Sequence, residues 1–207
     1  LDGTLFPYTT LFRSHGEGLP FLADFLRERG LRDAFRLKQV HGQRVVDVKL
    51  LDGVSGGRFS MLQSLEGDGL AGVEAGLAGV VSAADCTPVF ILSRRARAWA
   101  LLHAGWRGVA AGVLQAGLDR LRDLAGTDPS ELEIYLGPSI CGACYEVGRE
   151  VAVWLGVRGE ESPGFAGMTE RGAWRVDIRA VLAHQARSLG TPPENIGISR
   201  WCTRCNR

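Results

Sequence analysis

The sequence predicts an α/β (α+β) fold with mixed β-sheets. Short apolar runs typical of buried strands alternate along the chain with longer segments whose apolar residues repeat every three or four positions. With 207 residues and 45% hydrophobic residues, the chain is long enough for one domain with a substantial core. We therefore expect a single domain over residues 15–207.

The first half of this region predicts one helix followed by strands. Leucine and phenylalanine recur at helical spacing from Leu19, and Gly30 is a natural stop for a helix. Apolar runs predict strands over residues 35–40 and 44–50, and residues 52–57 are expected to form a loop.

The second half alternates buried strands with amphipathic helices. Strands are predicted over residues 77–82, 88–93, 98–102, 132–136, 174–176 and 196–199. Helices are predicted over residues 109–124, 148–155 and 178–189. The pattern shows no internal repeat and no linker.

Composition excludes several classes of function. The formal net charge is +1, so no global field draws the chain to nucleic acid or to an acidic membrane. No apolar run reaches the roughly 20 residues needed to span a bilayer. The five cysteines are an odd number, which argues against a disulfide framework. We expect a cytoplasmic monomer that acts on a small molecule.

The start of the chain does not look like part of the domain. Residues 7–14 read Pro-Tyr-Thr-Thr-Leu-Phe-Arg-Ser, which is similar to translated sequencing-adapter sequence. We expect residues 1–14 to be a non-native leader.

Three segments place a candidate metal ligand at the end of a predicted strand. His41 lies in Gln-Val-His-Gly, Cys86 in Ala-Asp-Cys-Thr-Pro, and His103 opens His-Ala-Gly-Trp-Arg-Gly. Two imidazoles and one thiolate suit zinc, and three protein ligands leave a fourth position open, as in catalytic zinc sites. Such a metal lowers the pKa of bound water to about 7.

Spacing alone leaves other interpretations of these residues open. A single His after a strand is commonly a polar residue with an ordinary partner, and a Cys between apolar strands is commonly a small buried side chain. A cysteine hydrolase with Cys86 as nucleophile and a histidine as base is also chemically reasonable.

In combination, the motifs resemble the YfiH family, also called the laccase-domain or polyphenol oxidase family. The resemblance rests on the three segments above and on Gly137-Pro-Ser-Ile followed by Cys144-Tyr-Glu-Val-Gly148, and it covers about residues 31–205. It implies a mixed-sheet sandwich with zinc held by His41, Cys86 and His103.

The resemblance also implies an activity. The family is associated with phosphorolysis of purine nucleosides (adenosine, inosine, guanosine and methylthioadenosine) and with adenosine deamination at the same site. An older assignment makes these proteins copper-dependent phenol oxidases, and copper is the alternative metal. The whole chain has only four histidines, which argues against a multi-copper cluster.

Further residues are candidates for the chemistry. We assign catalytic roles to His41, Asp85 and Cys86, where Asp85 would orient a ligand or carry a proton. Arginine forks match phosphate oxygens, and the residues expected to bind substrate or phosphate are Gln39, Arg44, Arg107 and Tyr145. Salt bridges, turn capping and packing are the alternative roles for these side chains.

Two Cys-x-x-Cys pairs, Cys141/Cys144 and Cys202/Cys205, offer a rival metal site. The pairs lie 57 residues apart (145 through 201), whereas a compact zinc ribbon has about 15 to 20 residues between its pairs. The spacing therefore argues against a zinc held by these four cysteines.

The chain departs from the family pattern at both ends. Members usually continue past the Cys202-Thr203 position into a Phe-Phe-Ser segment with an arginine, and they begin with a strand that is not evident here. We expect the domain to be incomplete at its C-terminus, which would leave the metal ligands intact and weaken the substrate pocket.

Overall fold

A six-stranded mixed sheet forms the centre of the molecule in a computed structural model that describes residues 28–51, 59–157 and 166–205. Its strands pair in the order β12 (Ile196–Ile198), β8 (Glu133–Leu136), β6 (Thr87–Ser93), β7 (Ala98–Ala104), β4 (Gly69–Gly72) and β2 (Val45–Asp47). The four central strands are antiparallel to one another, and the outer strands β12 and β2 each run parallel to the strand beside them.

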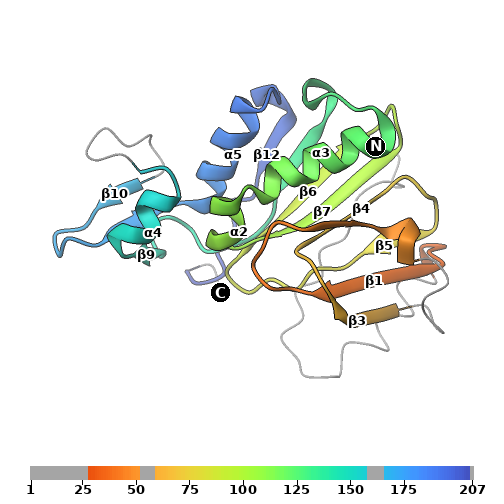
Figure 1. Cartoon of the computed structure of the whole chain (residues 1–207). Helices are drawn as coiled ribbons and strands as arrows, with labels where there is room; N and C mark the ends of the chain where they lie inside the picture. The colour runs from red at the N-terminus through yellow and green to blue at the C-terminus, as the bar shows by residue number, and fades with distance from the viewer. Residues whose placement is uncertain (1–27, 52–58, 158–165, 206–207) are drawn as a thin grey trace.

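Three helices cover one face of this sheet: α2 (Trp106–Ala111), α3 (Val113–Ala125) and α5 (Ile178–Ser188) (Figure 1). The main core lies beneath them, where Leu114 and Leu121 of α3 pack over Ile91 and Leu102 of the sheet. Gly117 allows this close approach, since a Cβ there would lie 2.8 Å from a Leu102 methyl carbon.

A small parallel sheet packs against the opposite face. Its order is β3 (Phe59–Glu66), β1 (Asp33–Lys38), β5 (Leu77–Gly79). Alternate residues of a strand point to opposite faces, so Leu70 joins Phe35 and Leu37 in this second core while its neighbour Ala71 joins the core under the helices. The central sheet is therefore covered on both sides.

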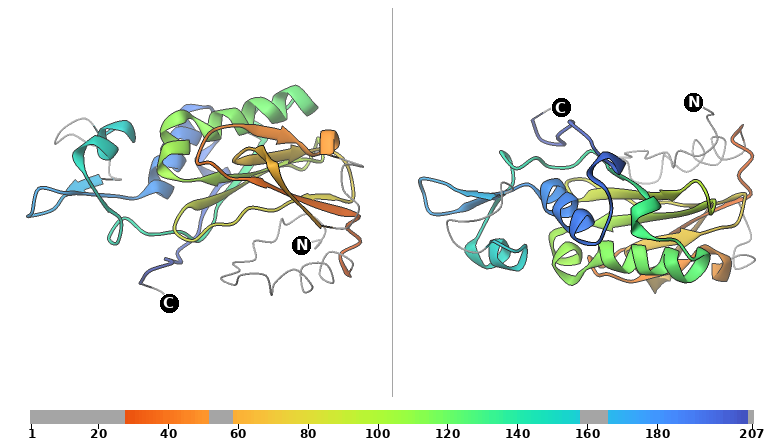
Figure 2. Two further views of the ribbon diagram at one scale, coloured as in Figure 1. Left: turned by 60° about the horizontal axis from the view of Figure 1, so that its bottom comes forward. Right: turned by 90° about the horizontal axis from the view of Figure 1, so that it is seen from above.

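A third unit extends sideways from these layers (Figure 2). It consists of the antiparallel sheet β10 (Ala166–Met168), β11 (Trp174–Val176), β9 (Glu146–Val147), together with α4 (Arg149–Trp154). Short 3-10 turns at Val48–Leu51, Pro129–Glu131 and Pro193–Asn195 complete the described elements.

The structure confirms the predicted fold class and corrects several elements. The helix expected over 109–124 is two helices, because Gly112 has a left-handed φ of 93° that interrupts the turn. The strand expected over 44–50 ends at Asp47, where the chain enters a 3-10 turn. Strands β3, β4, β9 and β10 were not predicted.

Some expectations fall outside the described residues. These are the leader over residues 1–14, most of the helix expected over 19–30, and the whole loop over 52–57. No helix in the described part of the chain is long and apolar enough to cross a membrane.

Candidate metal centre

The candidate ligands meet because strand ends converge at one edge of the central sheet. His41 lies in the turn that precedes β2, Cys86 directly precedes β6, and His103 is the penultimate residue of β7. The antiparallel register of β6 and β7 pairs Pro88 with His103, which brings the Cys86 side chain beside that imidazole. Residues far apart in sequence thus become neighbours through strand pairing.

One ligand atom from each of His41, Cys86 and His103 lies within 4.8 Å of the other two. The two imidazole rings meet edge to face, with centroids 4.8 Å apart. His103 is buried, Cys86 is half-buried and His41 is exposed. The group therefore has a closed side and an open side, as a metal that must receive a small molecule requires.

Asp68, at the turn between β3 and β4, organises this group. Its carboxylate accepts hydrogen bonds from the backbone N–H groups of Val40, His41 and Gly42 at 3.1, 2.9 and 2.7 Å. It also lies 2.8 Å from Nδ1 of His103, and its side chain is fully buried. One carboxylate therefore fixes both the turn that carries His41 and the ring of His103.

Electrostatics assign the protons in this pair. Burial raises the pKa of Asp68, but hydrogen bonds from His103 and from the three backbone amides outweigh burial and lower it. Burial disfavours the charged form of His103, yet hydrogen bonds and charges of Asp68 and Cys86 raise its pKa to about 9. Asp68 is thus a carboxylate that accepts a hydrogen bond from Nδ1 of His103. Nε2 is the nitrogen left to face the metal position, and it would release its proton when a metal binds.

Backbone geometry at the site is specialised. His41 has a φ of 60°, a left-handed conformation uncommon for a residue with a side chain. Gly105, the N-cap of α2, must be glycine because a Cβ there would lie 2.7 Å from Cδ2 of His41 and 3.0 Å from Sγ of Cys86. The start of the His-Ala-Gly-Trp-Arg-Gly turn thus forms a wall of the site.

The structure gathers several of the other predicted residues around the three ligands. Tyr145 is half-buried, and its pKa is raised by burial and by the charges of Cys86 and Asp85, with Arg107 opposing them. The Arg107 guanidinium is exposed and lies 4.3 Å above the Trp106 ring. A phenol therefore lies close enough to Cys86 to feel its charge, and a cation lies close to that phenol.

Three other predicted site residues make hydrogen bonds to other parts of the chain: Asp85, Gln39 and Arg44. Asp85 accepts a 2.6 Å hydrogen bond from the Thr203 hydroxyl. The Gln39 amide makes two bonds to the backbone of Ser82, at 2.8 and 2.7 Å. The exposed Arg44 contributes its carbonyl, which accepts from the N–H groups of residues 68 and 69. Their roles toward substrate stay predictions.

Comparison with protein families places this geometry in context. Residues 22–207 match the sequence model of a family described as multi-copper polyphenol oxidoreductase laccase.

The chain belongs to this laccase-domain family.

Named relatives from the same family are purine nucleoside phosphorylases. The *Streptomyces griseus* protein named Purine nucleoside phosphorylase ORF3 is 34% identical over 167 residues, which cover 81% of this chain and 63% of that protein. The *Bacteroides thetaiotaomicron* purine nucleoside phosphorylase is 32% identical over 137 residues, covering 66% and 51% respectively. The chain thus spans between about half and just under two thirds of the length of these relatives.

Solved structures of the laccase-domain family share the fold. YlmD from *Geobacillus stearothermophilus* superposes with a TM-score of 0.78 at 27% identity, covering 98% of this chain and 78% of that one. The hypothetical protein YfiH of *Bacillus licheniformis* gives a TM-score of 0.76 at 25% identity, covering 90% and 70%. The expected resemblance to YfiH is therefore confirmed.

Sequence reasoning missed Asp68. The segment Glu66-Gly67-Asp68-Gly69 looks like a polar turn, and nothing in its pattern marks the Asp as buried. A signal existed in the short run of apolar residues after Asp68, since an acidic residue directly before a buried strand can face the same sheet edge as the other ligands.

Linear spacing also gave no indication that the four cysteines lie close together. Cys141, Cys144, Cys202 and Cys205 form a second group whose sulfur atoms lie within 4.8 Å of one another. The 57-residue separation is irrelevant once β8 and β12 pair in parallel, because the loops that follow these two strands then emerge at the same sheet edge.

Proposed function

We propose that this laccase-domain chain is built for zinc-dependent purine nucleoside phosphorolysis, with adenosine deamination at the same site. The observation that carries the proposal is the group of His41, Cys86 and His103 with Asp68 behind it. The names of the *Streptomyces* and *Bacteroides* relatives support the reaction class.

The donor set fits zinc. Nε2 of His103, a ring nitrogen of His41 and the Cys86 thiolate would hold the ion, with Asp68 orienting the His103 ring as a carboxylate does behind many zinc-bound histidines. When bound, zinc supplies a Lewis acid that can polarise an oxygen or activate water near neutral pH.

The chain's own residues would position phosphate and nucleoside around this centre. In phosphorolysis a phosphate oxygen bonds to C1′ of the ribose while the bond from C1′ to the purine nitrogen breaks, and the departing base keeps the electron pair and gains a proton. Arg107 is the candidate to hold phosphate, because its guanidinium is exposed beside the site. Tyr145 stays a neutral phenol, since its pKa is raised, and it can donate a hydrogen bond to the base or ribose.

The test is product analysis on protein of known metal content. Zinc-loaded protein incubated with inosine should release hypoxanthine only when phosphate is present, and adenosine should also yield inosine. A His103→Ala variant should lose both reactions. Absence of free base and of inosine from zinc-loaded wild-type protein would reject the proposal for this chain. Oxidation of phenols by the copper-loaded protein, without nucleoside cleavage, would favour the oxidase that the family description names.

A second function is favoured by one specific observation. Cys86, His103 and Asp68 form a chain of hydrogen-bonded groups, the order that a cysteine hydrolase uses for nucleophile, base and orienting carboxylate. Alkylation separates the two functions. A nucleophilic Cys86 reacts with iodoacetamide in protein as purified, whereas a zinc-bound thiolate is protected until a chelator removes the metal.

A further inference from the structure

A second group of candidate metal ligands lies outside the proposed active site. We propose that Cys141, Cys144, Cys202 and Cys205 bind a structural zinc ion that joins the loop after β8 to the segment after β12. The four residues form two Cys-x-x-Cys pairs, and four thiolates are a common ligand set for structural zinc.

The sulfur positions suit a tetrahedral ion. Zinc–sulfur bonds of about 2.3 Å place the corners of a tetrahedron about 3.8 Å apart. Sγ of Cys141 and Sγ of Cys205 lie 3.8 Å apart, and all four sulfurs lie within 4.8 Å of one another. The sulfurs are thiols rather than disulfides, since a disulfide would need a separation of about 2.0 Å.

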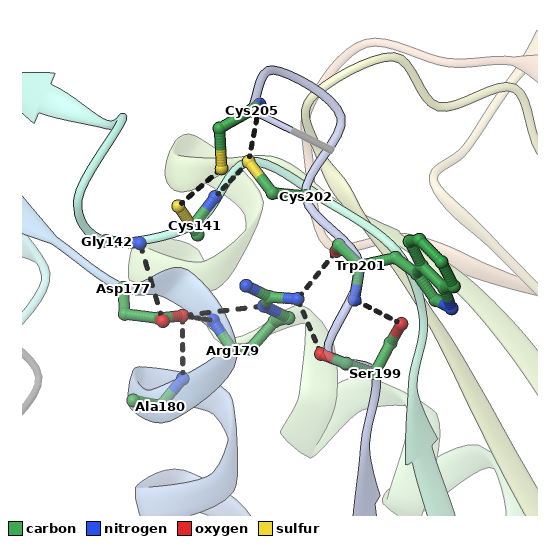
Figure 3. Close-up of polar contacts among 9 residues, drawn as sticks. All are labelled: Cys141, Gly142, Asp177, Arg179, Ala180, Ser199, Trp201, Cys202 and Cys205. Carbon is green, nitrogen blue, oxygen red and sulfur yellow. Dashed lines mark hydrogen bonds and ion pairs between the residues drawn. The ribbon is translucent and has the colours of Figure 1, made fainter. Parts of the chain in front are cut away.

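Backbone amides surround one sulfur in the way a thiolate ligand requires. Sγ of Cys202, a residue only 4% exposed, accepts from the N–H groups of Cys141, Arg204 and Cys205 at 3.3, 3.4 and 3.5 Å. Figure 3 shows the bonds from Cys141 and Cys205. Three donors aimed at one sulfur stabilise negative charge on it. These hydrogen bonds are a second observation beside the close spacing of the four sulfurs. They also indicate that Cys202 binds a cation as a thiolate.

The two loops are also fixed to each other by contacts that involve no sulfur. Ser139 and Cys202 form an isolated parallel bridge, and the Thr203 N–H donates to the Ser139 carbonyl at 3.2 Å. The Arg204 guanidinium donates to the Cys144 carbonyl at 3.1 Å. The four ligands are therefore brought together by the fold, and little ordering remains for the metal to impose.

The buried side chain of Arg179 anchors the segment after β12 that carries Cys202 and Cys205. Its NH1 donates to the carbonyls of Ser199 and Trp201 at 2.6 and 2.9 Å, which holds the chain just before Cys202 (Figure 3). Asp177, the N-cap of α5, accepts from the N–H of Gly142 at 3.4 Å in the first loop. Both loops thus rest on the N-terminal end of one helix.

This position gives the second centre a role beside the first. Cys144 directly precedes Tyr145, and Thr203 bonds the carboxylate of Asp85, which adjoins Cys86. A zinc ion on the four cysteines would hold Tyr145 and Asp85 in place beside the first group of ligands.

Metal counting tests the inference on the full chain. Wild-type protein purified without oxidant should contain two zinc ions per chain. The double variant Cys144→Ser/Cys205→Ser should contain one, as should His103→Ala, which removes a ligand of the first centre. Ala143→Ser, an exposed change between the two cysteines of the first pair, is the matched control and should retain two.

The outcomes separate this inference from the proposed function. One zinc that His103→Ala loses and the double cysteine variant keeps would overturn the second centre. One zinc that the double cysteine variant loses and His103→Ala keeps would support the second centre and count against zinc at His41, Cys86 and His103. One iron in place of the second zinc would overturn the metal assignment and keep the ligands.

Thiol protection decides the case should the double variant fail to fold. In native His103→Ala protein, iodoacetamide should label Cys86 quickly and the other four cysteines only after a chelator is added. The inference would be overturned if all five cysteines were labelled at one rate. It would also be overturned if mass spectrometry of the freshly purified protein found a disulfide among Cys141, Cys144, Cys202 and Cys205.

Discussion

Oδ1 of Asp68 lies 2.8 Å from Nδ1 of His103 and 2.9 Å from the backbone nitrogen of His41, so one oxygen atom connects two of the three candidate ligands. The third ligand, Cys86, reaches the same group through the register of β6 and β7. The site is therefore held by a buried carboxylate and a strand pair rather than by the ligands alone, and both supports can be altered experimentally.

Asp68→Asn should weaken zinc binding about 10- to 100-fold, because an amide cannot accept all four hydrogen bonds as a carboxylate does. Competition with a chelator of known affinity measures the change. Glu133→Gln, which alters an exposed carboxylate paired with Arg94, is the control and should leave affinity unchanged. Equal affinities in wild type and Asp68→Asn would show that the carboxylate does not support the ligands.

Gly105→Ala should displace His41 and Cys86, since its Cβ would lie 2.7 and 3.0 Å from atoms of those side chains. We expect at least a tenfold loss of zinc affinity and of nucleoside cleavage. Gly148→Ala is a closely matched control, because Gly148 is also an N-cap with extended backbone and has no atom within 4 Å of its Cβ position. Similar behaviour of the two variants would count against the close contact.

Arg107→Ala should raise the KM for phosphate about tenfold or more while leaving thermal stability nearly unchanged, because the side chain is exposed. Steady-state kinetics with phosphate varied at saturating inosine give the value. Arg200→Ala is the control, since Arg200 is also an exposed arginine over a tryptophan, here Trp201. An unchanged KM for phosphate in Arg107→Ala would remove Arg107 from the anion site.

Arg179→Ala should lower the free energy of unfolding by about 3 kcal/mol, because two backbone carbonyls, one buried and one partly buried, lose a buried charged donor. Arg187→Ala changes an exposed arginine in the last turn of the same helix and should cost only a few tenths of a kcal/mol. Urea unfolding followed by circular dichroism compares them. Equal costs would mean that Arg179 does not anchor the segment after β12.

The sequence identified candidate metal ligands where a histidine or cysteine stands at the end of a predicted strand. His41, Cys86 and His103 are recognisable because each carries a ligand atom beside a glycine or proline at the end of an apolar run. Asp68 also lies beside glycines and a short apolar run, but its role depends on which backbone amides a turn 27 residues away presents to it. Such information exists only in the folded chain.

Two other differences have physical causes of the same kind. A single glycine within a helical pattern is usually tolerated, so Gly112 gave no reason to divide the helix, yet its left-handed φ does so. The cysteine pairs were judged by linear spacing, whereas parallel pairing of β8 and β12 makes their separation along the chain unimportant.

The left-handed φ of His41 has a consequence for the rate of metal capture. Holding a histidine in this conformation costs on the order of 1 kcal/mol. The three hydrogen bonds from backbone N–H groups to the Asp68 carboxylate offset that cost when the chain folds. The ligand turn therefore has its final shape before an ion arrives. Uptake should proceed as a single bimolecular step whose observed rate rises linearly with metal concentration, without a plateau set by a slow rearrangement of the turn.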